Sequence, residues 1–205
     1  LVREVHHRIK NHLQGVTGLI ERYRHEHPGL DSALDAISGQ LQSIGTVYGL
    51  LARSGRSDLA LDEIAQAVTD GVRGIAPAGI SSNFPDGISA WRIAEQYCVP
   101  IALIVNELVM NAIKHGVARA DNASARVGCT MIPEGCMLCI VNAGTLPPGF
   151  DFHSGAGIRT GLRLVRTMLP AQGASLTFRS RSGEVDVALR LEPPVLVPLT
   201  LGDAV

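Results

Sequence analysis

Three residues with reactive or ligand-forming side chains share one stretch of the sequence, Val99 to Gly116. If this stretch is helical, Glu107, Asn111 and Lys114 lie in one narrow sector of the helix, opposite a broad apolar arc. A carboxylate, a carboxamide and an ammonium at this spacing can accept a proton, coordinate a hard cation and contact a phosphate. That combination suits metal-nucleotide chemistry. The solvated face of an ordinary amphipathic helix would show the same pattern, so both interpretations stay open.

A second candidate lies near the start of the chain, in the segment REVHHRIKNHLQ. Apolar residues within Val2–Ile20 recur at spacings of three and four, which predicts a helix over Leu1–Glu26. His7 falls nearly opposite this apolar stripe, whereas His6 lies on its flank. A solvent-facing imidazole offers a neutral nucleophilic nitrogen that can accept a phosphoryl group. A histidine on a merely solvated face would look the same.

Two glycine-rich turns are the third feature with possible chemistry. The first, Asn142 to Gly149, follows a predicted strand, and the second, Gly155 to Leu162, opens a predicted helix. Glycines just before a helix N-terminus let backbone N–H groups close on a phosphate, with help from the helix dipole. Most such turns only reverse the chain, so this signal needs support from other features.

Composition and charge indicate a globular protein. The chain has 205 residues, 46% of them hydrophobic, and a net charge of −1 that gives no basic excess for nucleic acid or anionic lipid. No apolar run reaches the length needed to cross a bilayer and no basic-then-apolar leader opens the chain, so we expect no membrane segment and a cytoplasmic location. Because position 1 already lies in a helical pattern, we expect a piece of a longer protein with an upstream part.

The four cysteines do not predict a disulfide framework in a chain of this length. Cys136 and Cys139 form a C-x-x-C pair within a probable strand. In a strand, a separation of three places two side chains on opposite faces. We therefore expect neither a zinc site nor a redox pair there.

Residues 1–54 predict an antiparallel helical hairpin. Asp31 and Ser32 offer an N-cap for its second helix, in which apolar residues within Leu34–Leu51 form a seam with a seven-residue period. Two such helices bury only one stripe against each other and leave an apolar flank. Pairing two hairpins into a four-helix bundle covers that flank, so we expect a homodimer.

Residues 55–205 predict an α/β sandwich with a mixed sheet, which makes the whole chain α+β. Asp58 can cap a first helix that carries Leu61 and Ile64, and later helices are expected from Ala94 or Pro100 to His115 and over Gly161–Leu169. The expected strands are Gly79–Pro85, Ala125–Ile132, Cys136–Val141, Leu176–Arg179 and Val185–Leu191. This order fits one sheet covered by helices on one face.

Together these pieces resemble the catalytic core of a sensor histidine kinase. HHRIKNHLQ is similar to the H-box of the subgroup written HHR-x-K-N-x-L-Q, which is related to the HWE kinases, and NELVMNAIKHG is similar to the N-box. The resemblance covers nearly the whole chain, with the two boxes about a hundred residues apart in the right order. It implies a dimerising phosphoacceptor hairpin followed by an ATP-binding domain of the gyrase/Hsp90/histidine-kinase/MutL type.

The resemblance also implies roles for individual residues. His7, which immediately precedes the arginine, would be the phosphoacceptor, and Glu107 would act as a base or orient the nucleophile. Asn111 would coordinate Mg²⁺ at the ATP phosphates. The implied nucleotide contacts are Asn111, Lys114, His115, Asn142, Gly144, Gly155, Gly157, Thr160, Gly161 and Leu162. A response-regulator aspartate would then take the phosphoryl group, and a sensory domain would lie upstream.

The first glycine box departs from the family pattern, Asp-x-Gly-x-Gly. Asn142 stands in place of the acid, Ala143 follows it, and the second glycine is missing. An asparagine carbonyl can still accept a hydrogen bond from adenine, at a cost on the order of 1 kcal/mol. The alternative function is a histidine phosphotransferase or scaffold that keeps His7 but has a degenerate pocket that does not bind ATP. Nucleotide binding separates the two hypotheses.

Overall fold

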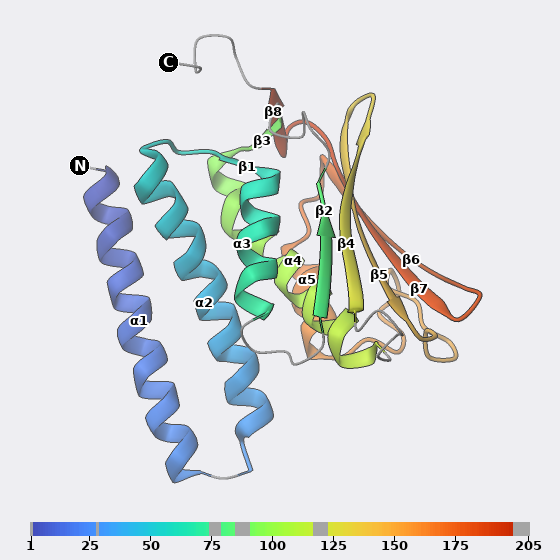
Figure 1. The fold of residues 1–205 in the computed structure, drawn as a ribbon, viewed down its shortest axis with the longest axis horizontal. Helices are drawn as coiled ribbons and strands as arrows, with labels where there is room; N and C mark the ends of the chain where they lie inside the picture. Colours follow the sequence, from blue (N-terminus) through green and yellow to red (C-terminus); the bar gives the residue numbers. More distant parts are fainter. Residues whose placement is uncertain (1, 28, 74–78, 85–90, 117–122, 199–205) are drawn as a thin grey trace.

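The computed structural model describes residues 2–27, 29–73, 79–84, 91–116 and 123–198, and it has the expected α+β architecture (Figure 1). The helical hairpin consists of α1 (Val2–Glu26) and α2 (Asp31–Ser54), and α2 lies between α1 and the rest of the molecule. Beyond the hairpin, α3 (Leu61–Arg73), α4 (Glu95–His115) and α5 (Thr160–Met168) cover one face of a sheet.

The main sheet has the strand order β2-β4-β5-β7-β6. Its strands are β2 (Gly79–Asn83), β4 (Ala123–Ile132), β5 (Gly135–Ala143), β6 (Ala174–Arg181) and β7 (Glu184–Leu191). Only the β2–β4 pair is parallel among these neighbours, so the sheet is mixed as predicted. The strand that we expected to reach Pro85 ends at Asn83, since Phe84 is described and is not part of it; Pro85 itself lies outside the described residues.

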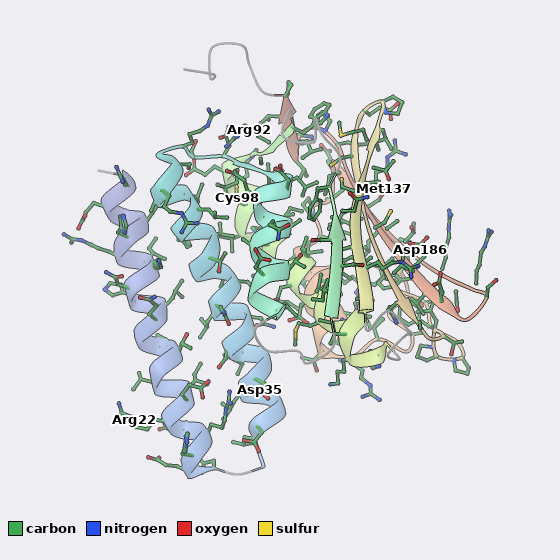
Figure 2. The ribbon with its side chains drawn as sticks, viewed as in Figure 1. Arg22, Asp35, Arg92, Cys98, Met137 and Asp186 are labelled. Carbon is green, nitrogen blue, oxygen red and sulfur yellow. The ribbon has the colours of Figure 1, made fainter. Side chains whose placement is uncertain are left out.

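Burial alternates along the central strands because helices cover only one face of the sheet. Cys136 is fully buried on the covered face, and Cys139 is on the opposite face, as the strand period predicts. Met137 and Asp186, labelled in Figure 2, also belong to the uncovered face. All four cysteines are free thiols.

A second, three-stranded sheet was not predicted. It is antiparallel with the order β1-β3-β8 and consists of β1 (Leu59–Ala60), β3 (Trp91–Ile93) and β8 (Leu196–Pro198). Strands of two and three residues are too short to show an alternating pattern in the sequence. They form here because their apolar residues, such as Leu59 and Ile93, are fully buried in the core.

Asp58 does not cap α3, contrary to the prediction. The backbone N–H of Ala60 donates instead to the Glu63 carboxylate at 2.9 Å. Asp58 Oδ1 accepts hydrogen bonds from Arg56 Nε at 3.0 Å and from the buried Arg92 Nε at 2.7 Å (Arg92 is labelled in Figure 2). Desolvation raises the pKa of Asp58, but the two guanidinium hydrogen bonds outweigh it and hold the pKa below its ordinary value. This ion pair ties the chain just after the hairpin to β3.

The start of α2 also differs from the prediction. Leu30 occupies the N-cap position without a side-chain hydrogen bond, so neither Asp31 nor Ser32 is the cap. The backbone carbonyl of Leu30 accepts the N–H groups of Ala33 and Leu34, each at 3.0 Å, which starts the helix. The Asp31 carboxylate lies in the first turn, where the positive end of the helix dipole favours it.

The buried side of α1 is rotated from the predicted stripe. His6 is only 6% exposed, with its ring centroid 5.6 Å from that of Tyr48 on α2. Val5 and Val16, which we predicted in the buried stripe, are 48% and 44% exposed. The rotation follows from the direction in which α2 packs on α1. His7, the next residue after His6, is exposed as predicted.

The α4 helix is the centre of the hydrophobic core. Its buried residues are Cys98, Ile101, Ala102, Leu103, Ile104, Val105, Asn106, Leu108, Val109 and Ala112. Contrary to our expectation from run lengths, α4 is long and apolar enough to cross a membrane, and it is the one such helix in the described part of the chain. A core helix meets the same test, because burial in protein and burial in lipid select the same apolar composition.

Pro100 lies inside α4, although it was one of two predicted starting points. A proline there cannot donate the helical hydrogen bond to the carbonyl four residues earlier. The helix nevertheless begins at Glu95, because the turn before Pro100 is fixed by tertiary contacts. Cys98 in that turn is fully buried, and the N–H of Ala94 donates to the Val195 carbonyl at 3.0 Å.

Candidate functional site

Glu107 is held between the hairpin and α5. Its Oε1 accepts a hydrogen bond from Gln40 Nε2 of α2 at 2.9 Å. Its Oε2 lies against the backbone of Gly161 in the first turn of α5, where a Cβ built on Gly161 would overlap the carboxylate. The absence of a side chain at Gly161 therefore lets α5 begin directly beside the polar side of α4.

Asn111 lies one turn after Glu107 on the same side of α4, as predicted. Its Nδ2 would be 3.9 Å from a Cβ on Gly161. The same Nδ2 is buried and has no hydrogen-bond partner among the residues that the structure describes. Leaving a buried amide unpaired typically costs about 1–3 kcal/mol, so a polar ligand that completes its hydrogen bonding would bind favourably here. Lys114 and His115, in the last turn of the helix, are exposed.

The first glycine turn closes on the C-terminal end of α4. Gly144 has a φ of 146°, and a Cβ on it would lie 3.2 Å from the carbonyl oxygen of His115. Asn142, at the end of β5, is 5% exposed and donates from Nδ2 to the Ala143 carbonyl at 3.0 Å. Because Nδ2 is engaged locally, Oδ1 is the end of this amide that can accept a hydrogen bond from a ligand.

The second glycine turn is divided between two places. Gly155 and Gly157 have positive φ values of 86° and 70° in a compact turn, which is closed by a 3.0 Å hydrogen bond from the Asp151 N–H to the Ala156 carbonyl. A Cβ on Gly155 would overlap the guanidinium of Arg166 on α5. The structure thus packs Gly155 against α5, whereas it brings Gly161 to Glu107 and Asn111.

The first turn of α5 contains the remaining predicted contacts. Thr160 is exposed, and Gly161 and Leu162 are half-buried. Arg159 is the N-cap residue, with extended backbone and no side-chain capping hydrogen bond. The N–H groups at the start of a helix have no partner within the helix. Because no side chain caps this helix, its first N–H groups can donate hydrogen bonds to a bound anion. These N–H groups adjoin the polar side of α4.

His7 lies on the hairpin, away from this cluster. It is exposed on α1, and α2 lies between α1 and α4 (Figure 1). Arg8 Nε donates to Glu4 Oε1 at 2.8 Å, and this hydrogen bond lowers the pKa of the Glu4 carboxyl. The His7 imidazole is exposed next to this ion pair in the sequence, and α2 separates its helix from α4.

Comparison with known proteins finds histidine kinases that are similar to this chain. A family model described as histidine kinase matches residues 4–75. The sensor histidine kinase PdtaS of Mycolicibacterium smegmatis is 27% identical over 201 residues, which is 93% of this chain and 39% of PdtaS. Residues 4–75 thus match the histidine kinase family, and the relative extends the sequence similarity over nearly the whole chain. The chain spans well under half of that relative's length.

Further matches agree with the family and the fold. A blue-light-activated histidine kinase of Rhizobium johnstonii is 29% identical over 136 residues, 66% of this chain and 36% of that protein. The solved histidine kinase domain from the Erythrobacter litoralis EL346 blue-light activated histidine kinase has a TM-score of 0.62 at 21% identity, over 93% of this chain and 90% of that one. At this identity the structure shows a shared fold only.

Sequence analysis missed Gln40, which the structure places beside Glu107. It lies 67 positions before Glu107, and no motif connects the two residues. The neighbouring Gly39 also approaches α4, because a Cβ on it would lie 3.9 Å from Nδ2 of the buried Asn106. The sequence carries no signal for this contact, since it depends on how the hairpin docks on α4.

Replacing Gly161 with alanine tests the contact between α5 and α4. Without a clash, Gly161→Ala would stabilise the helix by up to about 1 kcal/mol. We expect it to destabilise the protein by about 1–3 kcal/mol instead, because the new Cβ displaces Glu107. Denaturant unfolding measures the change. Gly18→Ala on α1 is the control, since a Cβ there meets nothing within 4 Å. Equal stabilisation by both substitutions would contradict the packing.

Proposed function

We propose that this kinase core binds Mg·ATP between α4 and α5 and phosphorylates His7, in the cytoplasm where ATP is supplied. The main support for this proposal is the packing of Gly161 against Glu107 and Asn111. It joins the uncapped start of a helix to a carboxylate and to a buried amide that has no partner in the described part of the chain, and these groups together can bind a phosphate chain and its cation. The cluster thus has the donor set that a metal-nucleotide requires.

Each part of the cluster has a proposed role. The Asn111 carboxamide oxygen would hold Mg²⁺, which supplies positive charge against the phosphates, while Lys114 and His115 contact the phosphates or ribose. Thr160, Gly161 and Leu162 would offer backbone N–H groups to the phosphates. Asn142 Oδ1 would accept the adenine amino group, with Gly144 shaping the loop beside it. Gly155 and Gly157 would support the loop that leads into α5.

The proposed transfer uses His7 as the nucleophile. A new N–P bond forms on its imidazole as the bond between the γ-phosphorus and the ADP oxygen breaks. Glu107 accepts the imidazole proton or orients the ring. An aspartate of a receiver domain then takes the phosphoryl group from the phosphohistidine. Because α2 lies between α1 and α4, transfer requires either a movement of the hairpin or a His7 from a second protomer.

The hairpin also supports a proposed homodimer. Large apolar side chains on α1 are exposed in the single chain, and the exposed fractions are 44% for Val16, 52% for Leu19 and 58% for Tyr23. On α2, Ile37 of the predicted seam is 46% exposed. A second hairpin would cover this surface in a four-helix bundle. Because the chain spans only 39% of PdtaS, we also propose that a sensory segment lies outside it.

Charging the apolar surface tests the homodimer. Leu19→Asp should convert a dimer to a monomer in light scattering coupled to size-exclusion chromatography, because a carboxylate cannot be buried unpaired in the bundle. Gln14→Asp, at an exposed position of the same helix, is the control and should stay dimeric. A monomeric unaltered protein at micromolar concentration would rule out the proposed bundle.

Removing the Asn111 carboxamide of α4 tests the proposed nucleotide binding. We expect the unaltered protein to bind Mg·ATP in calorimetry, and Asn111→Ala to lose most of the Mg²⁺-dependent part of the affinity, since it removes the proposed metal ligand. Binding in EDTA should differ little between the two proteins. If the unaltered protein shows no binding at millimolar ATP, the kinase proposal fails and the phosphotransferase alternative replaces it.

The identity of the phosphoacceptor is tested on the adjacent histidines. His7→Ala should abolish acid-labile, base-stable labelling from radioactive ATP and change stability by only about 0.5 kcal/mol, because His7 is exposed. His6→Ala should keep labelling but lose stability, because the ring is buried against Tyr48. Label that persists on His7→Ala and disappears from His6→Ala would reverse the assignment.

A further inference from the structure

We propose that Gln40 of the hairpin is a positioning residue for the phosphoryl-transfer site, so that the site is complete only when α2 is docked on α4. This inference rests on the proposed function, because Gln40 acts through Glu107. It extends that function by giving the hairpin a second role, the orientation of Glu107, in addition to the phosphoacceptor His7.

The contact is a charge-assisted hydrogen bond. Gln40 Nε2 donates to Glu107 Oε1 at 2.9 Å, and a neutral amide donating to a carboxylate forms a stronger bond than one between two neutral groups. A glutamate side chain has three rotatable bonds, and fixing one carboxylate oxygen fixes the direction of the other. With Oε1 held by Gln40, Oε2 is directed at the first turn of α5, beside Gly161.

The packing of α2 brings this donor to α4. A Cβ built on Gly39 would lie 3.9 Å from Nδ2 of the buried Asn106, so the two helices are close at this level. Ser43, one turn further along α2, is buried, but its Oγ donates to the Gly39 carbonyl of its own helix at 3.0 Å. Gln40 is thus the side chain of this turn that donates across to α4.

The hydrogen bond from Gln40 makes the orientation of Glu107 depend on the position of α2. Because α2 runs from the hairpin turn to the start of the α/β domain, a shift of this helix moves Gln40 relative to α4. Losing the hydrogen bond releases Oε1 and lets the Glu107 carboxylate rotate away from α5. Glu107 is therefore oriented by the state of the hairpin, and this contact couples the phosphoacceptor hairpin to the phosphoryl-transfer site.

The test uses variants that differ only in the donor. Gln40→Met keeps the length of the side chain and removes the N–H, so it should lower kcat of autophosphorylation about tenfold. KM for ATP and the calorimetric affinity for Mg·ATP should stay unchanged, because Gln40 does not touch the nucleotide. Gln40→Lys, which also donates to a carboxylate, should restore most of kcat. Gln42→Met is the matched control, since Gln42 is exposed on the same helix.

Each other outcome decides against the proposal. Unchanged kcat in Gln40→Met, or a fall that the lysine variant does not restore, would make the contact structural. An increase in kcat in Gln40→Met would show that the Gln40–Glu107 hydrogen bond slows the reaction.

If the unaltered protein binds no Mg·ATP, the proposed function fails. A double-mutant cycle of Gln40→Met with Glu107→Ala in thermal unfolding then reports the contact alone, and coupling there assigns Gln40 to docking only.

Discussion

The burial of α4 is the constraint on which the rest of the structure depends. Its apolar side fills the core beneath the five-stranded sheet, with residues such as Ile101, Ile104 and Leu108 almost completely buried. This packing fixes the rotation of the helix about its axis. A rotation by one residue, about 100°, would bury Glu107 in the core and expose apolar surface. The core therefore decides that Glu107 and Asn111 face α2 and α5.

Close approach of neighbouring segments then builds the site around that helix. Gly161 lets α5 begin against the carboxylate of Glu107, and Gly144 lets the loop after β5 approach the last turn of α4. At both points a side chain would meet α4 itself. The glycines therefore act by leaving room, and they bring the start of α5 and the end of β5 to one end of the same helix. This arrangement joins three segments that lie far apart in the sequence.

A comparable constraint orients the hairpin. Successive residues on a helix differ by about 100° in direction, so burying His6 against Tyr48 turns His7 toward solvent. The buried imidazole thus keeps its neighbour accessible. The apolar residues that α2 does not cover, including Leu19 and Tyr23, remain on the surface of the single chain. The same helix accordingly presents an accessible histidine and an apolar side that a second hairpin could cover.

The sequence by itself determined the helices, the five longer strands and the polar side of α4, because helical and strand periods are local properties that long elements repeat many times. It also determined that His7 is exposed, since its direction is nearly opposite the apolar stripe. It did not reveal β1, β3 and β8, whose two or three residues are too few to show a period.

Other features could be decided only by the tertiary structure. Asp58 was predicted to cap a helix, but its carboxylate accepts a hydrogen bond from Arg92, which is distant in the sequence. The buried side of α1 was set by the direction in which α2 packs, which leaves Val5 exposed. Gln40 reaches Glu107 because the hairpin docks on α4. Of the two glycines, Gly155 packs on Arg166 and Gly161 packs on Glu107. Local patterns specify which side of an element is apolar, but contacts between distant segments depend on how the elements pack, and no local pattern records that.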